Sequence, residues 1–436
     1  MQFQKDFIMK KNLLLILVFV ICFVSFSEVY SLEKEQPQKL TIEDCINIAK
    51  KNNPQLLSQK AIYESKIKTL DQAQSNYYPS LDLNMNYTGN NAIERHNDPI
   101  SLMGSYNSYK NTLILSQNIY DFGRREDNVK LKEFDIAIAR NNFNDTEKQV
   151  IYNVKNAYYN VLKSQRIIAQ DKLMIERSVS HVNQTTALFN AGKKPKYDVT
   201  KALVELSKSQ VTLISDKKDF IRNLGSLVTA IGSDISTDTE LVDNFDLIEF
   251  QMSLESAKEV AYKNRSDYLA KINKIDQTRM AIFSSEKDYY PKIIGALGYN
   301  YSGSRFPLEQ GWNIGAGLSW NLFNGFNTQS KIDENKKLLD ASYQDLQLLK
   351  LQIAVDMNTN YFSLSLNKEI IKASEVQVKY ATENLEQAEL RYSAGMGTVL
   401  DVIDTSSDFN DANIKYINAL YDYKISLANL EKTMGK

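Results

Sequence analysis

The sequence has 436 residues, and its 52 basic and 53 acidic residues leave a formal net charge of −1. A nucleic-acid-binding protein normally carries a concentrated basic face, so this balance argues against that class of partner. Cys22 lies in an N-terminal apolar run and Cys45 would then be the sole cysteine, while the two histidines, His96 and His181, are far apart. We therefore expect no disulfide, no catalytic residues, no cofactor and no metal site in the mature chain.

The N-terminus is typical of a cleaved secretory signal peptide. Lys10 and Lys11 precede an apolar run from Leu13 to about Phe26, and small serine residues follow it. A run of about 14 residues is shorter than the roughly 20 that a membrane-spanning helix needs. We expect a signal peptide over residues 1–31, and an uncleaved anchor is the alternative.

The rest of the chain contains two copies of one unit, because several motifs return in the same order. Tyr77-Tyr78-Pro79 returns as Tyr289-Tyr290-Pro291, and Ala191-Gly192 with Asp198 returns as Ala394-Gly395 with Asp401. We expect a first repeat over 32–232, a connector in an equatorial region over 233–253, and a second repeat over 254–436.

The hydrophobic period predicts the same series of elements in both repeats, after a short opening helix. In the first repeat, a helix over 54–76 precedes strands over 79–90 and 110–121, a long helix over 124–190 and a returning helix over 197–231. In the second repeat, the matching elements are a helix over 266–288, strands over 291–303 and 311–323, a long helix over 327–393 and a returning helix over 399–434.

The predicted strands alternate with a period of two between a polar face and an apolar face. Each is about ten residues long, which suits a tilted transmembrane strand. The apolar faces carry aromatic residues suited to lipid and its interfaces, namely Tyr87, Tyr299, Tyr301, Trp312 and Trp320. Four strands cannot close a membrane barrel, which needs about eight, so strands from other chains must pair with the edges.

The long helices carry apolar residues every seven positions, which is the pattern of coiled-coil packing. A helix of about 67 residues would be about 100 Å long. By themselves these seams would also fit a secreted or surface coiled-coil structural protein without a channel, which is the alternative function. The strands and the export signal favour a pore.

This order of elements resembles the TolC family of outer-membrane efflux and secretion channels. The most specific motif is Tyr392-Ser393-Ala394-Gly395 followed by Asp401-Val402-Ile403-Asp404. The resemblance covers nearly the whole mature chain. It implies an α+β membrane protein, a homotrimer with a 12-stranded outer-membrane β-barrel, four strands per chain, continued by a 12-helix periplasmic α-helical coiled-coil barrel.

The resemblance also implies a location and partners. The chain would lie in the cell outer membrane, in contact with its lipid, and extend into the periplasm. It would be a passive conduit, not an enzyme, for substrates delivered through a periplasmic adaptor (membrane fusion) protein by an inner-membrane pump of the RND, ABC or MFS type. The sequence does not indicate the cargo.

In this family, acidic residues just past the helical turns form rings at the periplasmic entrance. By position these are Asp401 and Asp404, with Asp198 as the equivalent in the first repeat, and Tyr392 matches a tyrosine of the closed gate. Three copies of each carboxylate around a narrow axis would favour cations. Helix capping is the alternative role of Asp198 and Asp401.

The turns themselves differ between the repeats. Gly397 stands where the family's best-known member has a gate arginine, so the gate bonds are not carried over. A basic tip of Lys193, Lys194 and Lys196 belongs to the first turn alone. We therefore expect Ala191-Gly192 and Ala394-Gly395 to dock the adaptor with unequal affinity.

Overall fold

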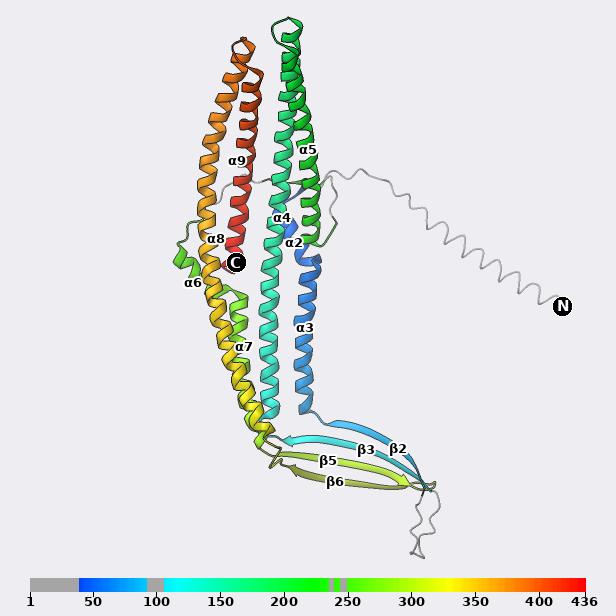
Figure 1. Cartoon of the computed structure of the whole chain (residues 1–436). Helices are drawn as coiled ribbons and strands as arrows, with labels where there is room; N and C mark the ends of the chain where they lie inside the picture. The colour runs from blue at the N-terminus through cyan, green and yellow to red at the C-terminus, as the bar shows by residue number, and fades with distance from the viewer. Residues whose placement is uncertain (1–38, 92–105, 235–238, 244–248) are drawn as a thin grey trace, which may run out of the picture.

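The computed structural model describes residues 39–91, 106–234, 239–243 and 249–436. The predicted signal peptide over 1–31 lies outside the described residues. Two pairs of long helices stand side by side, and a four-stranded sheet lies at one end of them (Figure 1).

The first repeat contains α2 (Ile42–Asn52), α3 (Pro54–Gln74), β2 (Ser80–Asn90), β3 (Tyr106–Tyr120), α4 (Arg124–Asn190) and α5 (Lys196–Ile231). The second contains α6 (Leu254–Asn264), α7 (Ser266–Glu286), β5 (Lys292–Gly303), β6 (Glu309–Ser319), α8 (Asn327–Ser393) and α9 (Val399–Thr433). Two short strands, β1 (Lys39–Leu40) and β4 (Glu240–Leu241), complete the set, and short 3-10 turns, Ser75–Tyr77 and Lys287–Tyr289, follow α3 and α7.

Local signals explain where these helices begin and end. Thr41 caps α2 through a reciprocal capping box with Asp44, and the Asn53 side chain caps α3, which begins at a proline. Gly232 ends α5 in the left-handed conformation, with φ of 73°. A side chain at Gly232 would approach backbone atoms of residues 52 and 53 within 3 Å, so the end of α5 packs tightly against the start of α3.

The long helices form one layer. In the half that leads to the helical turns, the order across this layer is α5, α4, α9 and α8, because α4 packs on α5, α9 packs on α8, and α4 meets α9 (Figure 1). Nearer the sheet the order is α3, α4, α7 and α8. In the half that leads to the turns, the helices at the two edges of the layer are therefore α5 and α8.

Each repeat has its own apolar core. In the first, Val154, Val161 and Leu227 are fully buried between α4 and α5. In the second, Met357 and Leu430 occupy the matching places between α8 and α9. These residues belong to the predicted seven-residue seams, so the seams close each helix pair upon itself.

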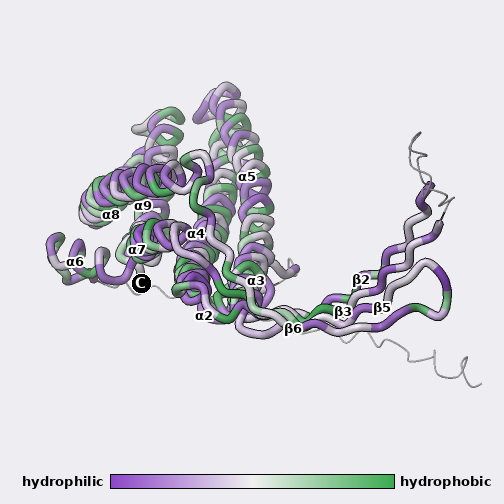
Figure 2. Tube along the Cα trace, turned by 90° about the horizontal axis from the view of Figure 1, so that it is seen from below, coloured by the Kyte–Doolittle hydropathy of each residue, from purple (hydrophilic) through white to green (hydrophobic). Residues whose placement is uncertain are grey.

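The sheet is an antiparallel meander with the order β2, β3, β5, β6. Figure 2, seen from below, shows the strands curving away to one side of the helices. Directly paired residues share a face, and the register aligns Leu83 with Leu113, Leu113 with Tyr299, and Tyr299 with Trp312. One face is therefore apolar across all four strands.

The opposite face carries mainly polar residues, namely Asp82, Asn84, Asn86, Lys110, Thr112, Asn300, Glu309 and Asn313. Two strand boundaries differ from the prediction by more than two residues. β3 begins earlier, at Tyr106, and β6 ends at Ser319 instead of continuing to 323. Trp320 therefore lies just beyond the strand, where its indole Nε1 donates to the carbonyl of Tyr289 at 2.9 Å.

The equatorial connector contains a contact that the sequence pattern does not predict. β1 and β4 pair in parallel, and the Tyr158 hydroxyl lies 2.6 Å from the carbonyl oxygen of Val242. The Asp243 carboxylate, whose side chain is 10% exposed, accepts hydrogen bonds from Arg166 of α4 and from the Tyr421 hydroxyl of α9. The connector is thereby bonded to both helix pairs.

Candidate functional site at the helical turns

The two helical turns lie at the end of the molecule farthest from the sheet (Figure 1). α4 ends before Gly192, with φ of 70°, and α8 ends before Gly395, with φ of 81°. Both glycines occupy the left-handed conformation that reverses a helix at low cost. The predicted docking residues Ala191, Gly192, Ala394 and Gly395 are all exposed.

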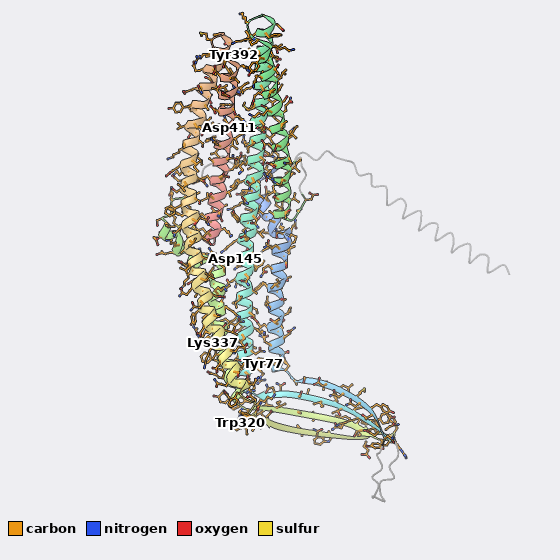
Figure 3. All side chains as sticks on the ribbon, viewed as in Figure 1. Tyr77, Asp145, Trp320, Lys337, Tyr392 and Asp411 are labelled. Atoms are coloured by element: carbon orange, nitrogen blue, oxygen red, sulfur yellow. The ribbon has the colours of Figure 1, made fainter. Side chains whose placement is uncertain are left out.

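Tyr392 joins the two turns. It lies near the tip of the second helix pair (Figure 3), is fully buried, and packs in a small apolar cluster with Val399 and Val402. Its hydroxyl donates to Thr185 Oγ1 of α4 at 3.3 Å. The predicted gate tyrosine therefore bonds the first helix pair.

Asp198 lies next to Tyr392 and is buried in the first turn of α5. It makes no side-chain cap there, since Pro195 holds the cap position without a capping bond. Burial raises the pKa of the Tyr392 hydroxyl, and the nearby Asp198 carboxylate raises this pKa further. Tyr392 consequently stays protonated and able to donate.

Asp401 and Asp404 lie on the exposed side of α9. Asp401 forms a capping box with Thr398, whose backbone amide donates to Oδ2 at 2.9 Å. These hydrogen bonds hold the pKa of Asp401 below its usual value. Asp401 therefore stabilises the start of α9 as part of this capping box and remains ionised. The structure places Asp198 at the buried contact and the other two carboxylates in solvent.

A pocket of about 590 Å³ opens between α4 and α8 just below the tip. Arg177 of α4 crosses it and pairs with Glu389 of α8 at 3.5 Å. His181 lines the pocket, and its ring centroid lies 5.2 Å from that of Tyr392. The imidazole Nε2 is buried without a hydrogen-bond partner among the described residues.

We expect His181 to make the tip sensitive to acid. Burial lowers the pKa of His181 below 6.5, and the Asp198 carboxylate opposes this shift only in part. Since the packed tip binds this proton less readily than a hydrated imidazole does, it loses stability as the pH falls below that value. The other charges that face the pocket are Arg177, Glu205, Glu386 and Glu389.

Spin labels on exposed Lys193 and Met396 test this expectation. Between about pH 7.5 and pH 5 the distance distribution across the turns should broaden. His181→Gln should remove most of the change, because glutamine does not titrate. Equal broadening in the glutamine variant would assign the effect to carboxylates instead.

Sequence reasoning missed two of these contacts. The ring of His181 packs against that of Tyr392, a contact between the two helix pairs that the sequence pattern does not predict. Lys194 was noted only as part of a basic tip, yet its Nζ donates to the Gly397 carbonyl at 2.9 Å. The duplication carries a usable signal for the second contact, since Lys194 and Gly397 occupy equivalent positions in the two repeats.

Four of the predicted strand aromatics lie within the sheet, and Tyr87, Tyr299 and Trp312 are 63%, 45% and 72% exposed. Tyr301 shares their face, whereas Trp320 lies beyond β6. Across the described ranges, no helix is long and apolar enough to span a membrane. Within the same residues, no cluster of three or more potential metal ligands occurs.

Comparisons with known proteins agree along most of the described chain. The family model described as outer membrane efflux protein matches residues 45–233 and 259–436. Outer membrane protein TolC of Salmonella enteritidis is 23% identical over 89% of this chain and 80% of its own length. The alkaline protease secretion protein AprF of Pseudomonas aeruginosa is also 23% identical, over 76% of this chain and 70% of its own length.

Solved structures show the same fold. The Campylobacter jejuni CmeC outer membrane channel superposes with a TM-score of 0.81 at 16% identity, covering 90% of this chain and 85% of that one. The open state of the Neisseria gonorrhoeae MtrE outer membrane channel gives 0.78 at 17% identity, covering 90% and 88%.

Proposed function

The chain belongs to the outer membrane efflux protein family, and on that premise we propose that it acts as a passive trimeric conduit. It is an outer-membrane channel protein of the efflux and type I secretion class, and it extends into the periplasm. The trimer, the closed barrel and the partners are the parts proposed here.

The observation that supports a ring of copies is that the sheet and the helix layer both end in edges without a partner in the described residues. β2 and β6 are the outer strands, and each has one described neighbour only. α5 and α8 are the outer helices, and both expose apolar residues to solvent. An unpaired strand edge and an apolar helix face require a partner. Copies arranged in a ring supply both at once, because edge α5 meets edge α8 of the next copy.

Three copies would join 12 strands and 12 helices, the numbers that the family resemblance implies. The apolar face with Leu83, Tyr299 and Trp312 would then meet lipid, with aromatic residues at its interfaces. The polar face with Asn84 and Asn300 would line the lumen. The alternation supports both assignments, since each strand of a membrane channel turns one face to lipid and the other to the water of the lumen.

The turns would form the periplasmic entrance. There Asp404 and Asp401 stay in solvent, and three copies around a narrow axis would favour cations. The exposed turns would contact a periplasmic adaptor, and a pump in the inner membrane would supply the energy. Exposed Lys193 and Lys196 give the first turn a charge that the second lacks, so unequal docking stays a prediction.

Conductance in planar bilayers tests the proposal. The purified protein should give discrete, cation-selective channels. Asp404→Asn should lower the permeability ratio of cation to anion severalfold, because it removes three ring charges without removing a cap. Asp401→Asn should do the same and also weaken the start of α9, because it removes the N3 carboxylate of the capping box.

The outcomes separate the alternatives. Absence of conductance from an assembled oligomer would favour the coiled-coil structural protein. Conductance with unchanged selectivity in both variants would keep the channel and reject the aspartate rings.

A further inference from the structure

Lys194 holds the two turns together in a way that uses the duplication itself. Lys194 and Gly397 are separated by 203 residues, as are Ala191 and Ala394, so they are the same position in the two repeats. In the structure these equivalent positions touch, and the Lys194 ammonium donates to the Gly397 carbonyl at 2.9 Å. We infer that Lys194 is the latch of the closed tip, and this inference rests on the proposed channel function.

The ammonium group makes a second contact at the same place. Its Nζ lies 4.9 Å from the centroid of the Tyr392 ring, within the range of a cation–π interaction. Tyr392 is fully buried and is also held by Thr185 and His181 of the first helix pair. Lys194 thus covers the ring that joins the two helix pairs and bonds the turn that follows it.

Gly397 makes this arrangement possible. A Cβ at Gly397 would lie 3.1 Å from the backbone nitrogen of Tyr392 and 3.3 Å from its Cα, because the turn packs against the end of α8. A side chain at Gly397 would require this neighbouring backbone to shift by a few tenths of an ångström. Gly397 brings no cation of its own to this contact, and Lys194 of the opposite turn supplies one.

Divergence of the two copies makes the contact complementary. Lysine at both equivalent positions would bring two like charges together, and glycine at both would leave the carbonyl without this donor. One lysine and one glycine give a charged donor and an open acceptor. The neighbouring Lys193 and Lys196 are exposed, whereas Lys194 is half-buried, so the three lysines are not equivalent.

The latch predicts a specific change in gating. Separating the turns breaks a charge-assisted hydrogen bond and uncovers an aromatic ring. Lys194→Met keeps the length of the side chain and removes the charge, so it should shift the balance from closed to open on the order of tenfold per protomer. Lys194→Arg keeps a cationic donor and should remain closed.

Single-channel recording of assembled trimers tests the inference, with Lys193→Met and Lys196→Met as matched controls. The parent protein should dwell mainly in a low-conductance state. Lys194→Met should dwell mainly in a high-conductance state, while both controls and Lys194→Arg behave like the parent.

Each other outcome has a defined meaning. Conductance of Lys194→Met equal to that of the controls overturns the latch and leaves the channel function intact. Failure of Lys194→Met to assemble, when Lys193→Met assembles, also overturns the latch, because a tip contact is not needed for assembly. Lack of conductance from every assembled protein, the parent included, rejects the channel function itself.

Discussion

Replacing Lys287 with methionine is expected to lower the free energy of unfolding by about 3–5 kcal/mol. Lys287 lies between α7 and β5, and its ammonium pairs at 2.5 Å with Asp127 in the first turn of α4. The Asp127 side chain is 3% exposed, so its carboxylate cannot recover hydration when the cation is lost. Guanidinium titration in detergent, followed by the helical circular dichroism signal, measures the loss.

A matched control lies at the same junction. Lys331 pairs with Asp288 at 2.8 Å, but the two side chains are 51% and 35% exposed. Lys331→Met should therefore cost less than about 1 kcal/mol. Adding Asp127→Leu to Lys287→Met should recover most of the stability, because it removes the uncompensated charge. An equal loss in both single variants would mean that burial does not determine the effect.

The position of this ion pair explains why it matters for a channel. Lys287 also donates to the Gly123 carbonyl at 3.1 Å, and the Arg124 guanidinium donates to the Lys287 carbonyl. These bonds join the start of α4 in one repeat to the end of α7 in the other. The sheet is thereby fixed to both halves of the helix layer where the strands leave it.

Local periodicity predicts the elements of this fold well. The long helices over 124–190 and 327–393 occupy Arg124–Asn190 and Asn327–Ser393 in the structure, because no proline or glycine interrupts either segment. The exposed aromatics of the sheet also follow from alternation alone. Trp320 is the exception, since it continues the alternation of β6 but bonds back to Tyr289 beyond the last paired residue.

Long-range contacts could not be predicted from such patterns. Asp243 stands in an acidic connector that would suit a solvated loop, yet Arg166 and Tyr421 bury it between helices of different repeats. Lys194 looked like one charge of a basic tip, and only the packing of the turns brings it to Gly397. Such contacts depend on how helices are placed in space, which a period of seven does not specify.

Introducing aspartate at Val211 or Ile221 is expected to abolish the proposed trimer. Both residues lie on the exposed side of α5, 67% and 68% exposed, and together with Val204 and Ile214 they form a second seam at coiled-coil spacing. Counted back from the turns, α8 exposes its own apolar residues at the same height, namely Leu366, Ile370, Val376 and Tyr380. Light scattering of the purified variants in detergent would report monomers.

The reason is that the proposed ring would place these two seams against each other, and a carboxylate there would be buried without a partner at every interface. Leu173→Asp on α4 is the control, because Leu173 is 53% exposed but belongs to an inner helix of the layer. It introduces the same charge at a comparable apolar position and should leave the trimer intact. Trimers from Val211→Asp would place the α5 seam outside the interface, and monomers from Leu173→Asp would mean that any added charge disrupts assembly. Monomers from Val211→Asp alone assign closure of the ring to the outer helices.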